Sequence, residues 1–197
     1  MKKVFGYPEF DENGEQLLTS YDNEYADMLM DIRVYRMKEG SKREFHREGE
    51  ETAILLLSGK IRYLWEGREE IASRKDVFHE GPFALHVPGG TPVCVRAETQ
   101  AEILVQCTKN EAKFPSHLYR PEEAPWKYSC VGEFGNTAKR RVNTIFDHEI
   151  SPKSNMVLGE VLNDPGNWSG YLPHRHAQPE TYYFKFDRPE GFGASFV

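Results

Sequence analysis

The chain has 197 residues, a formal net charge of −6, 39% hydrophobic residues and 28% charged residues. These proportions are ordinary for a globular protein and argue against a disordered chain. No basic stripe is long enough to follow a phosphate backbone, and no stretch approaches the roughly 20 apolar residues that cross a bilayer. We therefore expect no nucleic acid and no membrane as partners. The N-terminus turns polar at once and has no apolar signal region, which predicts a cytoplasmic protein.

Between about residue 30 and residue 108, the sequence predicts β-strands separated by turns. Asp31–Met37 alternates polar and apolar residues, as a half-buried strand does. Two apolar runs, Thr52–Leu57 and Ile61–Trp65, flank Ser58–Lys60 and are interpreted as the two strands of a hairpin. Further strands follow at intervals set by Gly and Pro (Ala84–Val87, Val93–Ala97, Ala101–Cys107). We expect at least seven strands here and no helix, a pattern typical of a sandwich or barrel.

The stretch 109–140 breaks this pattern. It holds Pro115, Pro121 and Pro125 and shows no clean alternation, so it is predicted to be a connecting segment. The densest basic run of the chain, Lys139–Arg141, is interpreted as part of a solvated loop. Strand patterns then resume in three runs, which indicates a second β unit (Arg141–Phe146, Met156–Leu162, Glu180–Phe186).

The segment 167–180 carries the residues with the clearest chemical meaning. His174 and His176 are two residues apart and would share one face of a strand. The loop Ala177–Pro179 follows, and Glu180 begins the next predicted strand, with Tyr182, Phe184 and Phe186 on its face. Two imidazoles and a carboxylate that converge from adjacent strands favour a divalent-metal site with room for water or substrate. The alternative is that both histidines and Glu180 are solvated surface residues.

The spacing His-x-His-x3-Glu is that of the first cupin motif. Together with its flanks, it resembles the 5-deoxy-glucuronate isomerases of inositol breakdown, which are related to the 5-keto-4-deoxyuronate isomerases (Gly166–Ser169, Pro173–His176, Glu180–Tyr183, Pro189–Phe192). Weaker matches extend upstream, so that the resemblance covers nearly the whole chain (Asp76–Phe78, Val87–Pro88, Phe114–Pro115, Arg120–Glu122, Gly135–Asn136). The loop between His176 and Glu180 is short, whereas many members carry an insertion there.

The resemblance implies an all-β bicupin, that is, two double-stranded β-helix or jelly-roll barrels. Residues 1–110 would form a degenerate first barrel, 111–140 an inter-barrel segment and 141–197 the start of a second, metal-binding barrel. His174, His176 and Glu180 would hold a divalent metal, Zn or Mn before Fe or Ni, together with one more histidine. We expect that histidine to lie beyond Val197, so that the second barrel is incomplete in this chain.

In the first barrel, the matching motif positions do not carry a full ligand set. His46 is followed by Arg47–Glu48 instead of a second histidine, Glu51 stands at the carboxylate position, and Val93 stands where a ligand is expected. We therefore expect the first barrel not to bind a metal. His46 is interpreted as part of a surface pair, and His79 and His86 as structural residues.

The activity that the resemblance implies is an aldose–ketose isomerisation of a deoxy-uronate such as 5-deoxy-glucuronate. A divalent metal would polarise the carbonyl, and a base must take up a proton. Glu160 is the first candidate for that base because it follows Gly159 on a strand expected beside the ligands. Tyr182 is the second candidate, two residues after Glu180 on the same face. For Glu160, a solvent-facing structural carboxylate is an equally good interpretation.

Two other classes of protein also fit the sequence. A non-catalytic bicupin that binds a sugar acid, or that only folds and associates, is favoured by the incomplete second barrel, because open sheet edges must be covered. We expect such cover from a homo-oligomer. A 2-His-1-carboxylate site also fits a non-haem Fe(II) oxygenase. The isomerase ranks first because only its family matches outside the motif.

Overall fold

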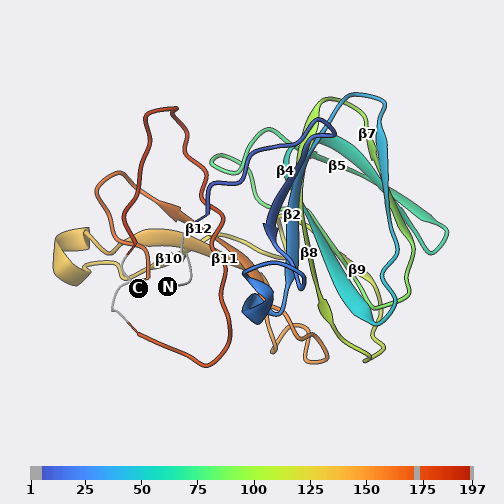
Figure 1. Ribbon diagram of the computed structural model, residues 1–197. Coiled ribbons are helices and arrows are strands. Elements are labelled where there is room, and N and C mark those ends of the chain that lie inside the picture. The colour runs from blue at the N-terminus through green and yellow to red at the C-terminus, as the bar shows by residue number, and fades with distance from the viewer. Residues whose placement is uncertain (1–5, 171–173, 196–197) are drawn as a thin grey trace.

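The computed structural model describes residues 6–170 and 174–195, and the regular secondary structure of this part of the chain is almost entirely β-strand (Figure 1). Two short 3-10 turns, η1 (Ala26–Met28) and η2 (Glu133–Asn136), interrupt the strands. In the described part of the chain, no helix is long and apolar enough to span a membrane. The strands run from β1 to β9 in a first unit (Glu15–Thr19, Asp31–Met37, Lys42–Phe45, Glu50–Trp65, Arg68–Arg74, Ala84–Val87, Val93–Ala97, Ala101–Lys109, His117–Tyr119).

These strands form two antiparallel sheets that face each other as a barrel. The large sheet has the order β1-β2-β8-β4-β6-β9, and the small sheet has the order β3-β7-β4-β5. Strand β4 belongs to both sheets, because its first half pairs with β6 and β8 and its second half pairs with β5 and β7. This architecture confirms the predicted all-β barrel.

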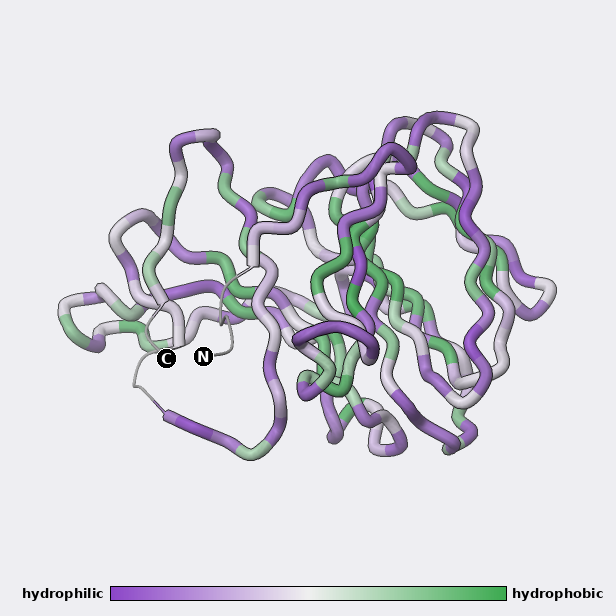
Figure 2. The backbone as a smooth tube through the Cα atoms, viewed as in Figure 1, coloured by the Kyte–Doolittle hydropathy of each residue, from purple (hydrophilic) through white to green (hydrophobic). Residues whose placement is uncertain are grey.

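The barrel core lies between the two sheets. Alternation along each strand sends one set of side chains inward, and Ile54, Leu56, Tyr63 and Ile103 are completely buried there. Burial of one such side chain stabilises the fold by about 1.5–3 kcal/mol. Figure 2 shows the hydrophobic colour concentrated on the barrel strands and the hydrophilic colour on the connecting turns.

The predicted hairpin at Ser58–Lys60 is wrong, because Glu50–Trp65 is one continuous strand of 16 residues. Ser and Gly are typical of turns, but here they mark the place where β4 passes from one sheet to the other. Gly59 has φ +97, and a Cβ atom at this position would lie 2.4 Å from the carbonyl oxygen of Gln100. Only glycine fits this bend, so the residue that suggested a turn allows the strand to continue.

A flanking sheet, β10-β11-β12, packs against the outer face of the large sheet (Lys127–Ser129, Arg140–Phe146, Leu158–Asn163) (Figure 1). A second apolar cluster joins them, with Ile145, Phe146 and Leu158 against Ala53 and Leu55. The segment predicted as a connection contains β9 and β10. Each of these strands has three residues, which is too few to show an alternation of polar and apolar side chains. The proposed domain boundaries stay predictions, although β9 carries the large sheet past residue 110.

The flanking sheet has one face against the barrel and one open face. Asn143 lies opposite Glu160, and both side chains point to the barrel, where Asn143 is buried. Val142 lies opposite Val161, and this pair is on the open face, where Val161 is 42% exposed. By the same alternation, Arg140 is on the open face. The interpretation of Lys139–Arg141 as a solvated loop is therefore wrong for two of its three residues.

The predicted strand Glu180–Phe186 does not form among the described residues. A strand needs a neighbour for its ladder hydrogen bonds, and none of the described strands pairs with this segment. Its side chains nevertheless alternate as predicted. Tyr183 packs against the second apolar cluster and Lys185 pairs with Glu102 of the barrel, whereas the other set is exposed (Glu180, Tyr182, Phe184, Phe186).

Candidate functional site

The His176 imidazole is held through both of its nitrogens. Nδ1 lies 2.8 Å from the carbonyl oxygen of Gln178, and Nε2 lies 3.1 Å from Oε2 of Glu180. The short loop after His176 produces both contacts, because it turns the chain back toward the ring. A histidine that binds a metal commonly donates its other N–H to a backbone carbonyl, which orients the ring. The contact of Nδ1 with a backbone carbonyl is therefore the one expected of a metal-binding histidine, and Glu180 lies on the side of Nε2.

The third predicted ligand does not converge with these two. The His174 and His176 ring centroids are 6.0 Å apart, with the rings tilted by 41°. Within 6–170 and 174–195, no three His, Cys, Asp or Glu side chains are grouped closely enough to hold a metal ion. Residues 171–173, which include the predicted pocket residue Pro173, lie outside the described residues. The donor types fit a divalent metal, so the ligand set stays a prediction of which the structure brings together two members.

Tyr182 extends this arrangement by one more side chain. Burial, together with a hydrogen bond to the Glu180 carboxylate and the charge of that carboxylate, raises the pKa of the Tyr182 phenol to about 12, while the Arg140 charge acts in the opposite direction. The phenol ring also stacks on Phe184 at 6.1 Å. His176, Glu180 and Tyr182 thus form a continuous row of polar groups.

Glu160 is placed on the other side of the flanking sheet. Its two carboxylate oxygens lie 2.7 and 2.8 Å from the guanidinium nitrogens of Arg74. Arg74 is completely buried in the barrel wall and also donates to the carbonyl oxygens of Leu56 and Glu80. Asn143 adds a hydrogen bond of 3.3 Å to the Glu160 carboxylate. The catalytic role of Glu160 stays a prediction, and its observed contacts are those of a joint between barrel and flanking sheet.

A second joint is made by Glu51 and His86, which are completely buried at 0% and 1% exposure. The Glu51 carboxylate lies 2.8 Å from His86 Nε2 and accepts hydrogen bonds from the Ser154 hydroxyl and the Asn155 backbone N–H. Phe146 stacks on the His86 ring at 4.3 Å. Glu51 therefore points out of the barrel toward residues 146–155, and not inward as a motif carboxylate would. Val93 lies in the barrel core.

The substitution Glu51→Gln is expected to lower the free energy of unfolding by about 1–2 kcal/mol, because the amide keeps one acceptor for Asn155 but removes the charge that three donors share. Urea unfolding of the two proteins measures this difference. The exposed surface residue Glu48, which pairs with His46 at 3.1 Å, provides the control Glu48→Gln. An unchanged unfolding midpoint in Glu51→Gln would contradict the role of this joint.

The other histidines of the first barrel lie in surface contacts. His46 pairs with Glu48, and His79 Nδ1 lies 2.8 Å from Asp76, whose carboxylate also accepts from the His79 backbone N–H. The contact with Glu48 is a surface pair of the kind that the sequence indicated for His46. Both contacts are exposed and contribute little to stability.

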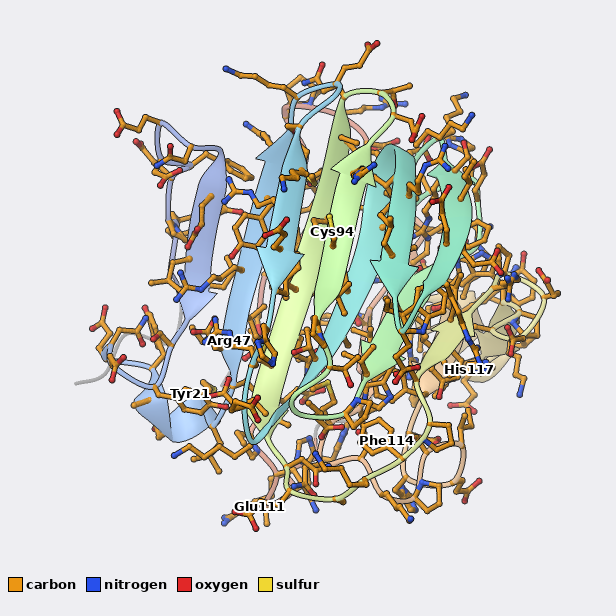
Figure 3. The ribbon with its side chains drawn as sticks, turned by 90° about the vertical axis from the view of Figure 1, so that its right-hand side faces the viewer. Tyr21, Arg47, Cys94, Glu111, Phe114 and His117 are labelled. Atoms are coloured by element: carbon orange, nitrogen blue, oxygen red, sulfur yellow. The ribbon has the colours of Figure 1, made fainter. Side chains whose placement is uncertain are left out.

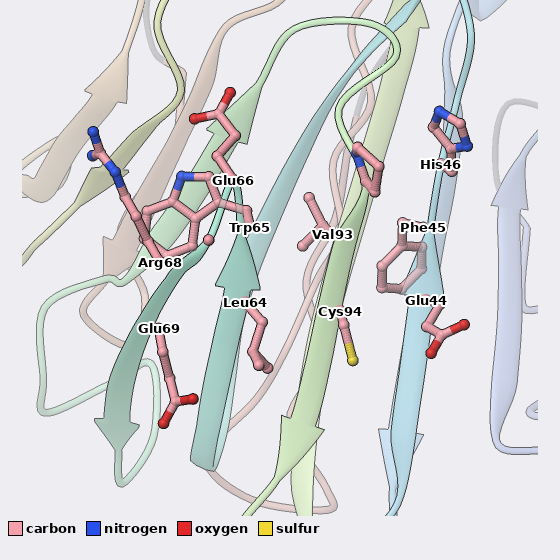
Figure 4. Close-up of a pocket in the computed structure, with 12 residues that line it drawn as sticks. Glu44, Phe45, His46, Leu64, Trp65, Glu66, Arg68, Glu69, Val93 and Cys94 are labelled. Carbon is pink, nitrogen blue, oxygen red and sulfur yellow. The ribbon is translucent and has the colours of Figure 1, made fainter.

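A hollow of about 660 Å³ opens at the ends of β3, β4 and β7, away from His176 (Figure 4). Phe45, Trp65 and Val93 line its inner part, and two carboxylates of its rim already have cations, Glu44 with Lys42 and Glu69 with Arg62. Figure 3 shows the outer face of this small sheet, where Cys94 lies near the start of β7. The buried Trp65 indole N–H has no partner within the described residues, but water cannot reach it. Because the carboxylates of Glu44 and Glu69 are already paired with cations, no active site is assigned to this hollow.

Comparisons with known proteins agree with the arrangement of strands and residues. The model of the KduI/IolB family matches residues 6–197. The protein named 5-deoxy-glucuronate isomerase from Geobacillus kaustophilus is 31% identical over 171 residues, which cover 81% of this chain and 60% of that protein. The chain thus spans about 60% of the length of this curated relative.

Among the solved structures that are similar to this chain, one shows the same fold over most of the chain. A crystal structure of an IolB-like protein from Salmonella typhimurium LT2 is similar with a TM-score of 0.58 at 17% identity, over 70% of this chain and 52% of that chain. A cupin superfamily protein from Desulfitobacterium hafniense is also similar, with a TM-score of 0.37 at 18% identity over 48% of this chain and 74% of that chain. The IolB-like structure thus shares the all-β fold that was predicted for this chain.

Proposed function

Because the chain belongs to the KduI/IolB family, we propose that it serves the metal-dependent aldose–ketose isomerisation of a deoxy-uronate such as 5-deoxy-glucuronate, a step of inositol catabolism. The reaction breaks the C2–H bond of the aldose, forms a C1–H bond and moves the carbonyl from C1 to C2. One proton also passes between the two oxygens. The site therefore has to bind a sugar acid, polarise a carbonyl and transfer protons.

The observation that carries this proposal is the row His176–Glu180–Tyr182. His176 and Glu180 supply an imidazole nitrogen and a carboxylate oxygen 3.1 Å apart, on a ring oriented by the Gln178 carbonyl. With His174, they would hold a divalent cation, Zn or Mn before Fe or Ni. Such a cation would polarise the sugar carbonyl and stabilise the negative charge that develops on its oxygen.

The side chains of the row have separate tasks. The raised pKa keeps the Tyr182 phenol protonated at neutral pH. On substrate binding, the phenol turns from Glu180 to donate its hydrogen bond to a sugar oxygen and exchanges the hydroxyl proton with it. Phe184, which stacks beside Tyr182, gives the sugar ring an apolar wall. We do not assign the removal of the C2 proton to Glu160, because its carboxylate would first have to break its ion pair with Arg74.

A second candidate function is the binding of a sugar acid without turnover. It is favoured by the separation of His174 from His176, which leaves the described donors without a set of three. In this case, the row would recognise the sugar but would not polarise its carbonyl.

Incubation of the protein with 5-deoxy-glucuronate and one divalent metal at a time tests the proposal. Proton NMR is expected to show conversion to the ketose that stops when a chelator is added. An oxygen electrode is expected to show no oxygen consumption, because isomerisation requires no oxidant. Binding without conversion for every metal would support the second candidate, and oxygen uptake that follows substrate loss would replace both with an oxygenase.

A further inference from the structure

The segment 180–186 carries Glu180 and Tyr182 of the candidate site, although it belongs to none of the described sheets. In residues 6–170 and 174–195, the backbone of 180–187 forms no hydrogen bond with another part of the chain. Side chains therefore have to hold this segment in place. They point alternately outward and inward, and the inward set is the one that can attach the segment to the barrel (Thr181, Tyr183, Lys185).

The three inward side chains contribute unequally. The Thr181 hydroxyl is buried but has no hydrogen-bond partner among the described residues. Tyr183 is partly buried against the second apolar cluster. An apolar contact of this kind is not directional, so it leaves the segment free to slide or turn. Lys185 is the member of this set that forms an ion pair, and its partner is Glu102 of the barrel.

Glu102 is held firmly in the barrel wall. It is the second residue of β8, and its side chain is 11% exposed. One carboxylate oxygen lies 3.3 Å from Nε of Arg36 on the neighbouring strand β2, and the other accepts a hydrogen bond from Nζ of Lys185. The Arg36 guanidinium in turn lies 3.8 Å from the centre of the Phe10 ring. The ion pair therefore joins a fixed carboxylate to a segment that has no ladder of its own.

Lys185 is close enough along the chain to influence the site. An extended chain advances about 3.3 Å per residue, which places Lys185 about 10 Å from Tyr182 and about 16 Å from Glu180. Because successive side chains point to opposite sides, an inward face that is fixed also fixes the direction of the outward face. Without the ion pair, Tyr183 alone would hold this end of the segment through an inward side chain.

We propose that Lys185 and Glu102 are positioning residues, whose ion pair holds the segment 180–186 on the barrel and thereby sets where Glu180 and Tyr182 point. The consequence for metal binding rests on the proposed function, because Glu180 is one of the expected ligands. Neither Lys185 nor Glu102 touches the substrate or the metal in this arrangement. Their ion pair limits the conformations of the segment, so that less conformational entropy is lost when a metal binds.

Chymotrypsin cleavage of the metal-free protein tests the ion pair without an activity assay, because Tyr182 and Phe184 are exposed cleavage sites in this segment. Mass spectrometry measures the rate at these two sites. Cleavage follows the population of the released segment, and loss of a largely buried ion pair should raise that rate about tenfold in Lys185→Gln and in Glu102→Gln. The double variant should be cleaved about as fast as either single variant, since both substitutions remove the same contact.

Zinc affinity is the second readout, and an ion pair with a merely structural role would leave it unchanged. Competition with a fluorescent chelator is expected to show about tenfold weaker zinc binding by Lys185→Gln, as is common when a residue that supports a metal ligand is lost. Lys185→Arg keeps the positive charge and should restore both slow cleavage and the wild-type zinc affinity.

Arg188→Gln is the matched control. It removes the same charge three residues further along, where the Arg188 side chain is 73% exposed and lies 3.9 Å from the Asp187 carboxylate. This variant should match the wild-type protein in both readouts, and thermal unfolding confirms that every variant is folded. Equal cleavage rates in the wild-type protein and Lys185→Gln would overturn the proposal, as would faster cleavage with unchanged zinc affinity. A wild-type protein that binds no zinc would disprove the metal site of the proposed function, while the cleavage rates would still decide whether Lys185 and Glu102 hold the segment.

Discussion

The substitution Tyr182→Phe is expected to lower kcat for isomerisation of 5-deoxy-glucuronate by about 100-fold or more, with little change in KM. The phenol is a proton-donating side chain hydrogen-bonded to the Glu180 carboxylate. A positioned proton donor typically contributes about 10²–10⁴-fold to a rate. Phenylalanine keeps the ring that stacks on Phe184, so substrate packing is preserved while the proton transfer is lost. Steady-state kinetics by NMR or a coupled assay measures both constants.

Tyr183→Phe is the matched control for this experiment. Tyr183 is the adjacent phenol, but it faces the barrel and packs against the second apolar cluster, where burial raises its pKa to about 12. Its removal should leave kcat within about twofold of the wild-type value, because the ring and not the hydroxyl makes the contact. If Tyr182→Phe turns over at the wild-type rate, proton transfer by Tyr182 is disproved.

The substitution Glu160→Gln is expected to lower the free energy of unfolding by about 3 kcal/mol. Arg74 is completely buried, and Glu160 is its carboxylate partner. Loss of one member of a buried ion pair leaves an uncompensated charge, which costs about 3–5 kcal/mol. The expected loss of stability is larger than for Glu51→Gln. The NH₂ group of the new amide would face the Arg74 guanidinium, which cannot accept a hydrogen bond. Urea unfolding followed by circular dichroism measures the change.

The double substitution Arg74→Met with Glu160→Leu separates the charge effect from the loss of packing. Replacement of both charges by apolar side chains should recover much of the stability, since neither charge remains buried alone. Turnover by folded Glu160→Gln should stay close to the wild-type value. A large loss of kcat without a loss of stability would instead restore Glu160 as the catalytic base that its position after Gly159 suggested.

Local alternation predicted much of the first barrel from the sequence. Asp31–Met37, Ala84–Val87 and Val93–Ala97 form strands with the predicted bounds, since each is half-buried or buried within a sheet of near neighbours. The prediction of a hairpin at Ser58–Lys60 failed because the sequence around a glycine that bends a strand between two sheets looks the same as the sequence around a glycine in a hairpin turn. The difference is the contact with Gln100, which lies 41 positions away and leaves no local signal.

The candidate site was predictable where its residues are close in sequence. His176 and Glu180 are four residues apart, and the short loop between them is sufficient to bring their side chains together. The two joints were missed because their partners are far apart, Glu160 from Arg74 by 86 positions and Glu51 from Asn155 by 104. The strand position of Arg140 was missed because the run Lys139–Arg141 has the composition of a loop, whereas β11 begins at Arg140.

The measurement that tests the central claim most directly is the number of metal ions per chain, determined by elemental analysis of the purified protein beside the double variant His174→Ala, His176→Ala. The proposed site predicts close to one divalent metal per chain in the wild-type protein and a loss of that metal in the variant, with both proteins folded. Absence of metal from the folded wild-type protein after incubation with Zn, Mn, Fe and Ni would contradict the claim, as would equal metal content in the two proteins.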